Sequence, residues 1–281
     1  MPKRVQSPSS INLYKQCNRK YYYVYLKGFQ LLPSIHTVRG NVAHSVLENF
    51  YNIDLKNITK ENCKEKLQKI IPKLLLQYWA AAKPEFEKLE LGESEIAFYL
   101  EETLVMLFNW LNHFTDRVIQ HADLDFETAF KALTPIREKQ YVSKVHSVRG
   151  FIDAIEHATD GVRIMDYKTS KDAVITPEYR LQLAIYSLLY HETHGHAPKQ
   201  VGIFFLKDKP QFINVDHYLI EMAKREIELV HKGTASEDIT DYPKTDDRKW
   251  CRYCEFAEPC FGIKNGKFEK STKMGEKTSR R

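Results

Sequence analysis

The chain has 281 residues, of which 43% are hydrophobic and 28% are charged, a composition typical of a globular protein with a sizeable core. It has no run of about 18 apolar residues and no apolar signal segment near Met1, so neither a transmembrane helix nor secretion is expected, and the predicted location is cytoplasmic. The net charge of +5 resides in residues 264–281, which hold seven Lys or Arg and two Glu. We expect this basic tail to be solvated and disordered, or to add screened attraction for nucleic acid.

Helical patterns dominate the first half of the chain. One helix is predicted to run through to about Tyr23, after a cap at Ser9 or Ser10, and a second is predicted over about 38–51. From residue 60 to 121 the apolar residues recur at three- and four-residue spacing. This periodicity predicts a helical insertion over about 52–137.

Strand patterns begin near residue 138, where Val, Ile, Tyr and Phe become frequent. Helices and strands alternate from there on, which predicts an α/β fold with a mixed sheet. We expect a single domain over 1–263. The predicted strands are 138–145, 148–157, 162–169, 200–207 and 211–218, and the predicted helices are 177–194 and 219–232.

Two acids and a lysine lie on the predicted hairpin of the second and third strands. Asp166 and Lys168 are two residues apart on one strand, so they share a face. A two-residue loop at 159–160 would put Asp153 opposite Asp166, and a loop at 160–161 would put it opposite Lys168. Either register gathers the three side chains on one face, whereas an odd-numbered loop would separate them.

Adjacent carboxylates on a sheet repel each other unless a cation neutralises them. Their hard oxygen atoms suit Mg²⁺ or Mn²⁺, and such an ion polarises a phosphoryl oxygen and lowers the pKa of a bound water. A neighbouring lysine can position that water or stabilise the developing charge. The trio is therefore a candidate site for phosphodiester hydrolysis. The alternative is an exposed hairpin with solvated charges.

Four further residues could complete such a site. His44, on a predicted helix, would add an imidazole ligand, and Glu138 could add a carboxylate, although its claim is weaker. Gln182 and Tyr186 are four residues apart on a predicted helix, so they share a face that could contact substrate or a metal-bound water. The structural alternatives are an exposed or packed His44 and a Tyr186 buried in the core.

The cysteines form a second cluster near the C-terminus. Cys251, Cys254 and Cys260 are closely spaced, and Cys17 or Cys63 could supply a fourth ligand. In a cytoplasmic protein such a cluster more often binds metal or reacts than forms disulfides. Soft thiolates select zinc or an iron–sulfur cluster, and the spacing alone leaves both open.

The order of the motifs resembles the RecB-like branch of the PD-(D/E)XK nuclease superfamily over about residues 9–261. The matching segments are Gly40-x-x-x-His44-x-x-Leu47-Glu48, Gly150-x-x-Asp153, Asp166-Tyr167-Lys168-Thr169 and Gln182-x-x-x-Tyr186. The resemblance implies a restriction-endonuclease-like sheet flanked by helices. It also implies a role for each motif residue. The metal ligands would be His44, Asp153, Asp166 and the carbonyl of Tyr167. Lys168 would be the catalytic lysine, and Gln182 and Tyr186 would be supporting residues.

The segment from Cys17 to Tyr21 resembles the N-terminal Cys-Pro-x-x-Tyr motif of iron–sulfur nucleases in the RecB, AddB and CRISPR-adaptation group, with Asn18 in place of proline. The arrangement of one cysteine followed by three, at 250–261, matches that group. The resemblance implies that Cys17 is the fourth ligand of a [4Fe–4S] cluster, with zinc as the alternative. Such a cluster would tie the first helix to the C-terminal segment.

The same resemblance implies a metal-dependent DNA nuclease, either an exonuclease or an end-processing enzyme on single-stranded DNA, in CRISPR adaptation or DNA repair. The chain lacks a Gly-x-x-x-x-Gly-Lys-Ser/Thr motif, so the implied partners besides DNA are a separate helicase or CRISPR-adaptation proteins. The rival hypothesis is a non-catalytic DNA-binding module with a cysteine-bound metal. The presence of both hairpin acids and the lysine argues against this rival.

Overall fold

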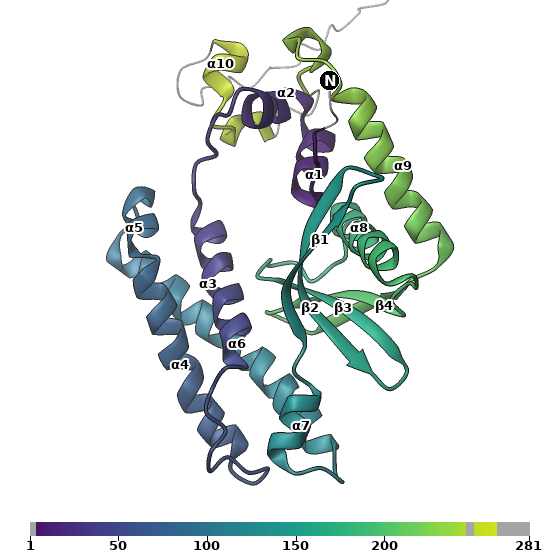
Figure 1. The fold of residues 1–281 in the computed structure, drawn as a ribbon. Helices are drawn as coiled ribbons and strands as arrows, with labels where there is room; N and C mark the ends of the chain where they lie inside the picture. Colours follow the sequence, from purple (N-terminus) through teal and green to yellow (C-terminus); the bar gives the residue numbers. More distant parts are fainter. Residues whose placement is uncertain (1–3, 246–249, 263–281) are drawn as a thin grey trace, which may run out of the picture. The chain divides into compact units, whose positions relative to one another are not determined.

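A computed structural model describes residues 4–245 and 250–262 of the chain (Figure 1). The basic tail predicted over 264–281 lies outside the described residues. The chain divides into two units: residues 1–11 join 33–235 in the first, and 12–32 join 236–281 in the second. No helix in the described ranges is long and apolar enough to cross a bilayer.

A five-stranded mixed sheet forms the centre of the first unit. Its strand order is β1-β2-β3-β4-β5, and the pairings are antiparallel except for β3 with β4, which run parallel. The predicted mixed α/β sheet is therefore confirmed. The bounds are β1 Ile136–Ser143, β2 Val148–Ala158, β3 Gly161–Lys168, β4 Gln200–Phe205 and β5 Pro210–Asn214.

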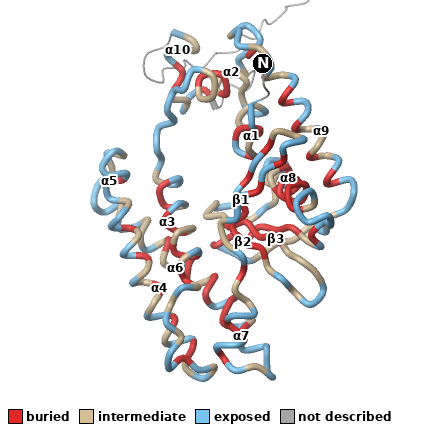
Figure 2. Tube along the Cα trace, in the orientation of Figure 1, coloured by how far each residue is buried: buried red, intermediate tan, exposed pale blue. Residues whose placement is uncertain are grey.

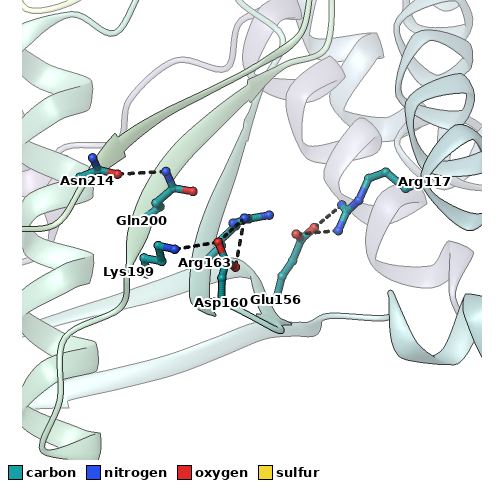
Figure 3. Close-up of polar contacts among 7 residues, drawn as sticks. All are labelled: Arg117, Glu156, Asp160, Arg163, Lys199, Gln200 and Asn214. Atoms are coloured by element: carbon teal, nitrogen blue, oxygen red, sulfur yellow. Dashed lines mark hydrogen bonds and ion pairs between the residues drawn. The ribbon is translucent and has the colours of Figure 1, made fainter. Parts of the chain in front are cut away.

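The β2–β3 hairpin has the two-residue loop at 159–160, because Ala158 pairs with Gly161. Ion pairs surround this turn (Figure 3): the carboxylate of Asp160 lies 3.0 Å from a guanidinium nitrogen of Arg163 and 2.8 Å from Nζ of Lys199. Further along the same hairpin, Glu156 accepts two hydrogen bonds from Arg117, at 2.8 and 3.0 Å. These contacts help to fix the register that carries the hairpin acids.

Two long helices follow the sheet strands. α8 (Pro177–His194) is capped by Thr176, whose side-chain oxygen accepts from the amide of Tyr179 at 3.4 Å, and it packs on β1, β2 and β4. α9 (His217–Gly233) packs on α8. Asp216 caps α9, so the chain is already helical from residue 217, where a strand was predicted to continue to 218. The strand β5 therefore ends earlier than expected, at Asn214. Buried residues concentrate in the sheet and in α8 (Figure 2).

The predicted helical insertion and the preceding helix α3 (Ile35–Phe50) pack into a core that extends to the sheet. Phe50 packs edge-on against Trp110 and Phe114, with ring centroids 4.9 and 5.5 Å apart. This core is continuous with Met165 and Tyr167 of β3. The elements are α3 Ile35–Phe50, α4 Cys63–Ala81, α5 Lys83–Phe86, the 3₁₀ turn Glu87–Leu89, α6 Glu93–Gln120 and α7 Phe126–Ala132.

The N-terminal helix is not continuous to Tyr23, so that prediction is wrong. Cys17 adopts an extended conformation with φ −160° and ψ 109°, and its sulfur accepts a hydrogen bond from the amide of Lys20 at 3.4 Å. Cys17 therefore caps a new helix, a role that its sequence context does not reveal. The resulting elements are α1 Pro8–Gln16, α2 Asn18–Tyr21 and a π-helical turn Tyr22–Leu26.

The second unit is built around aromatic side chains. Tyr21, Tyr22 and Tyr23 are buried together with Tyr242 and Phe256. The C-terminal part contributes the 3₁₀ turns Ile239–Asp241 and Trp250–Tyr253 and the helix α10 Ala257–Phe261. The cysteine segment of 250–261 thus folds against the N-terminal residues of the same unit.

Candidate active site and cysteine cluster

The pairing of β2 with β3 changes character at the two hairpin acids. The regular ladder reaches Ala154 opposite Met165. Beyond this pair the two strands separate, and the backbone amide of Tyr167 donates to Oδ2 of Asp153, at 2.8 Å. A side-chain carboxylate thus replaces a backbone carbonyl as acceptor. This hydrogen bond holds Asp153 at the point where the strands separate. Asp153 and Asp166 are both buried.

His44 reaches this gap from α3. Its Nδ1 lies 3.3 Å from Oδ2 of Asp153, and its Nε2 lies 2.9 Å from the carbonyl oxygen of Tyr167. Burial opposes protonation of the imidazole, but the carboxylate of Asp153, helped by that of Asp166, outweighs it and raises the pKa of His44 to about 9. The raised pKa favours the protonated ring, which can donate from both nitrogens.

Glu138 joins the same group from β1. Its neighbours Arg137 and Lys139 pair with Ala154 and Ile152, so Glu138 itself lies opposite Asp153. Its φ of +46° is unusual for a residue with a side chain and marks a local distortion of the strand. Burial and the charge of Asp153 raise the pKa of Glu138 to about 7.

Ligand atoms of His44, Glu138 and Asp153 all lie within 4.8 Å of one another. Two carboxylates and one imidazole at this spacing can hold a divalent cation, and the carbonyl of Tyr167 lies beside the imidazole. The motif pattern made Glu138 only a weak candidate for a metal ligand. In the structure Glu138, and not Asp166, belongs to this group of three. The positive φ that places it could not be recognised from the sequence.

Asp166 takes part in a second, linked set of contacts. Its Oδ2 lies 2.7 Å from Nζ of Lys168, and its Oδ1 accepts from Nε2 of Gln182 at 2.8 Å. Gln182 also donates to the hydroxyl of Tyr186 at 2.8 Å. Burial raises the pKa of Asp166, and the lysine beside it opposes that shift. Burial would lower the pKa of Lys168, but Asp166 raises it, so the amine is held charged.

Arg39 supports the chain directly after Lys168, although the motif pattern did not single it out. Its Nη2 donates to the carbonyl oxygen of Thr169 at 3.1 Å, and its Nη1 pairs with Glu102 of α6. The guanidinium also lies over the ring of Tyr99, 5.5 Å from the ring centroid. The position of Arg39 next to Gly40 of the histidine motif was the available signal.

The predicted residues thus fall into two neighbouring groups. One group holds His44, Asp153 and the Tyr167 carbonyl together with Glu138, and it has the oxygen-rich composition that a hard divalent ion requires. The other group holds Asp166, Lys168 and Gln182, and Tyr186 contacts Gln182 rather than the acid. The charges of Asp153 and Asp166 act on each other electrostatically. Together they can bind a cation and present a charged amine beside it.

The four predicted cysteine ligands line one pocket in the second unit. Cys17, Cys251, Cys254 and Cys260 share it with the rings of Tyr23, Phe256 and Phe261 and with the side chains of Arg19, Lys20 and Lys244. Burial raises the pKa of the Cys254 and Cys260 thiols.

Cys63 does not belong to this pocket. It begins α4 in the other unit, where it is buried, and its thiol donates to the carbonyl of Lys60 at 3.3 Å. Cys17, and not Cys63, is therefore the fourth thiol that lines this pocket.

A family model described as the PD-(D/E)XK nuclease superfamily matches residues 6–261. Over 185 residues the chain is 23% identical to an ATP-dependent helicase/nuclease protein from Bacillus cytotoxicus, covering 59% of this chain and 13% of that protein. Over 120 residues it is 26% identical to the Gene 69 protein of Mycobacterium phage D29, covering 40% of this chain and 42% of that protein. The chain thus spans less than half the length of both relatives.

Among solved structures, a crystal structure titled as that of a candidate exonuclease from Eubacterium rectale is similar in fold. The similarity covers 93% of this chain and 94% of that one, with a TM-score of 0.50 and 13% sequence identity. At this identity the likeness concerns the fold alone.

Proposed function

Because the chain belongs to the PD-(D/E)XK nuclease superfamily, we propose that it is a metal-dependent DNA nuclease that hydrolyses phosphodiester bonds. We further propose that it is an exonuclease or end-processing enzyme that acts on single-stranded DNA. The observation that carries this proposal is the group formed by His44, Glu138 and Asp153, with the Lys168–Asp166 pair beside it. A purely structural sheet has no need for three neighbouring acids, two of them buried and the third half-buried.

The residues have separate roles in the proposed reaction. His44, Asp153 and the Tyr167 carbonyl, with Glu138 or Asp166, would hold Mg²⁺ or Mn²⁺. The bound ion would polarise the phosphoryl oxygen and acidify a water molecule. Lys168 would orient the attacking water or stabilise charge that develops on the phosphate. Gln182 would hold the carboxylate of Asp166 in place, and Tyr186 would hold Gln182 in turn.

We propose that the cysteine pocket holds an iron–sulfur cluster, with zinc as the alternative. Four thiols line one pocket, and four thiolates are the ligand set of a [4Fe–4S] cluster. We propose a structural role for it, because it would join segments more than 230 residues apart in sequence.

The biological setting is proposed from the relatives. One of them is named for both helicase and nuclease functions. We therefore propose that it acts in DNA repair together with a helicase, or in CRISPR adaptation with the proteins of that pathway.

A nuclease assay with paired variants tests the proposal. Lys168→Ala and Asp166→Ala should lose at least about 100-fold in the rate of cleavage of end-labelled single strands in Mn²⁺. The matched control is Lys199→Ala, which removes a lysine–aspartate pair of similar length, 2.8 Å, at the far end of the sheet. A closed circular strand that survives while the linear strand is degraded supports exonuclease action. If the wild type cleaves no DNA under any divalent ion but binds it, the chain is a binding module instead.

Iron analysis and visible absorption of anaerobically purified protein test the cluster. We expect about four iron atoms per chain and a brown protein. A colourless protein with one zinc per chain would overturn the iron–sulfur assignment and leave the nuclease proposal untouched.

A further inference from the structure

The outer end of the β1–β2 hairpin carries an exposed face next to the candidate active site. Gln140 lies opposite Phe151, and Val142 lies opposite Arg149. All four are exposed, and the exposed fraction of Phe151 is 52%. We call these four residues the hairpin face. An exposed aromatic ring beside an exposed apolar residue on a sheet leaves apolar surface that a partner can cover.

Tyr141, Gly150 and Ile152 alternate with these residues along the two strands, so they point to the opposite side, where they are buried. The ring of Tyr141 contacts Tyr190 of α8, with centroids 6.1 Å apart. A Cβ atom on Gly150 would meet the ring of Tyr186 at 3.0 Å. The hairpin face is therefore the side that α8 does not cover, and the side chain of Phe151 is left open to solvent there.

The charge of this hairpin suits a polyanion. Residues 139–152 contain no Asp or Glu. Of their three basic residues, Arg149 belongs to the hairpin face and Lys144 to the adjoining turn, whereas Lys139 pairs with Ile152 and lies on the other side. Within the described chain, the guanidinium of Arg149 has no ion-pair partner. A positive surface with an open aromatic ring is the combination by which proteins hold single-stranded nucleic acid: the phosphates pair with the cations and a base stacks on the ring.

The hairpin face is also continuous with the candidate active site and rigidly held. Phe151 precedes Asp153 by two residues on β2, a distance of about 6.6 Å along a strand. That distance corresponds to about two steps of stacked nucleotides at about 3.4 Å each. β2 is supported on both sides here, because Gln6 accepts from the amide of Arg149 at 2.9 Å on the side opposite β1. A platform that needs no ordering loses little entropy when a strand binds.

We propose that the hairpin face is the docking site for the single strand that enters the active site, with one base stacked on Phe151 and a phosphate held by Arg149. This inference rests on the proposed nuclease function and adds the surface that selects an unpaired strand. The unpaired strand is selected because only an unstacked base can offer its face to the ring. The hairpin would thus place the phosphodiester one or two nucleotides further on beside Asp153.

Binding measurements in a Lys168→Ala background, which keeps the strand uncut, test the proposal. The probes are a fluorescent oligothymidylate and an abasic strand of equal length and charge, titrated in Ca²⁺. Phe151→Ala should weaken oligothymidylate binding by about 5- to 150-fold, the equivalent of about 1–3 kcal/mol per stacked base. It should leave binding of the abasic strand unchanged. Arg149→Ala should weaken the binding of both strands. It should also reduce the steepness of the fall of log K with log salt by about 0.7.

Two variants on α9 provide matched controls. Tyr218→Ala removes another exposed aromatic ring, and Arg225→Ala removes another exposed arginine. Neither should change the affinity for either strand. The proposal is overturned if Phe151→Ala behaves like Tyr218→Ala in a protein that binds and cleaves DNA. It is also overturned if Phe151→Ala changes the oligomeric state rather than DNA affinity, since the face would then join two copies of the chain. If the wild type neither binds nor cleaves DNA, the nuclease proposal fails with it.

Discussion

Metal binding at the acid–histidine group should release protons, and the number released can be worked out from the site. A metal ligand must be a neutral imidazole or an ionised carboxylate. In the metal-free site the pKa of His44 is raised to about 9 and that of Glu138 to about 7. At about pH 7 the imidazole of His44 should be protonated in nearly all molecules and the carboxyl of Glu138 in about half of them. Binding of Mn²⁺ should therefore release about 1.5 protons.

The same pKa values determine how the affinity for Mn²⁺ should change with pH, in direction and in size. About two pH units separate neutral pH from the pKa of His44, so protonation weakens metal binding at about pH 7 by roughly 100-fold, or about 2.7 kcal/mol. The apparent affinity for Mn²⁺ should rise steadily as the pH increases and level off above about pH 9. It should not rise on acidification, because acid adds protons to both ligands.

Isothermal titration of Mn²⁺ in two buffers with different ionisation enthalpies measures the proton count directly. Glu138→Gln should lower the count at about pH 7 from about 1.5 to about 1, because only His44 then loses a proton. An affinity that stays constant between about pH 7 and about pH 9, with no proton released in the wild type, would show that His44 and Glu138 do not surround the metal.

Three further predictions concern support of the site and the fold. Gln182→Leu removes the amide donor to a buried carboxylate, so kcat in saturating Mn²⁺ should fall by about 10- to 100-fold, and an unchanged kcat would contradict the supporting role. Gly202→Ala would place a Cβ 2.4 Å from the carbonyl oxygen of Gln211, so urea denaturation should show a loss of about 1–3 kcal/mol, whereas an unchanged midpoint would refute the clash. Cys17→Ser should abolish cluster absorption and lower Tm by about 5–10 °C, while Cys63→Ser should leave the absorption intact; equal spectra for both variants would refute the cysteine assignment.

Much of the fold could be predicted from the sequence, because each part of the sheet has a local signal. Segments rich in Val, Ile, Tyr and Phe located the strands. Of the two even-numbered loops that the sequence allowed for the β2–β3 hairpin, the structure has the one at 159–160. The helix after the third strand was predictable from Thr176 and Pro177, which cap and begin it. Spacing also brought Asp166 and Lys168 together, since strand neighbours two apart share a face.

The remaining features depend on tertiary contacts that leave no local pattern. The left-handed conformation of Glu138, which places its carboxylate opposite Asp153, has no glycine or turn signal to reveal it. The break in the first helix arises because the sulfur of Cys17 accepts from a backbone amide, whereas cysteine is not among the usual capping residues. The contact of Arg39 with Thr169 joins residues 130 positions apart, and no single-sequence periodicity reports such a pair.

The most direct test of the central claim is a Mn²⁺ titration of single-turnover DNA cleavage, carried out side by side for the wild type and His44→Ala. We predict no cleavage by the wild type without a divalent ion. We also predict that His44→Ala requires at least about tenfold more Mn²⁺ for half-maximal rate, because one ligand is lost. Cleavage that persists in chelator, or that responds to Mn²⁺ identically in both proteins, would contradict the account.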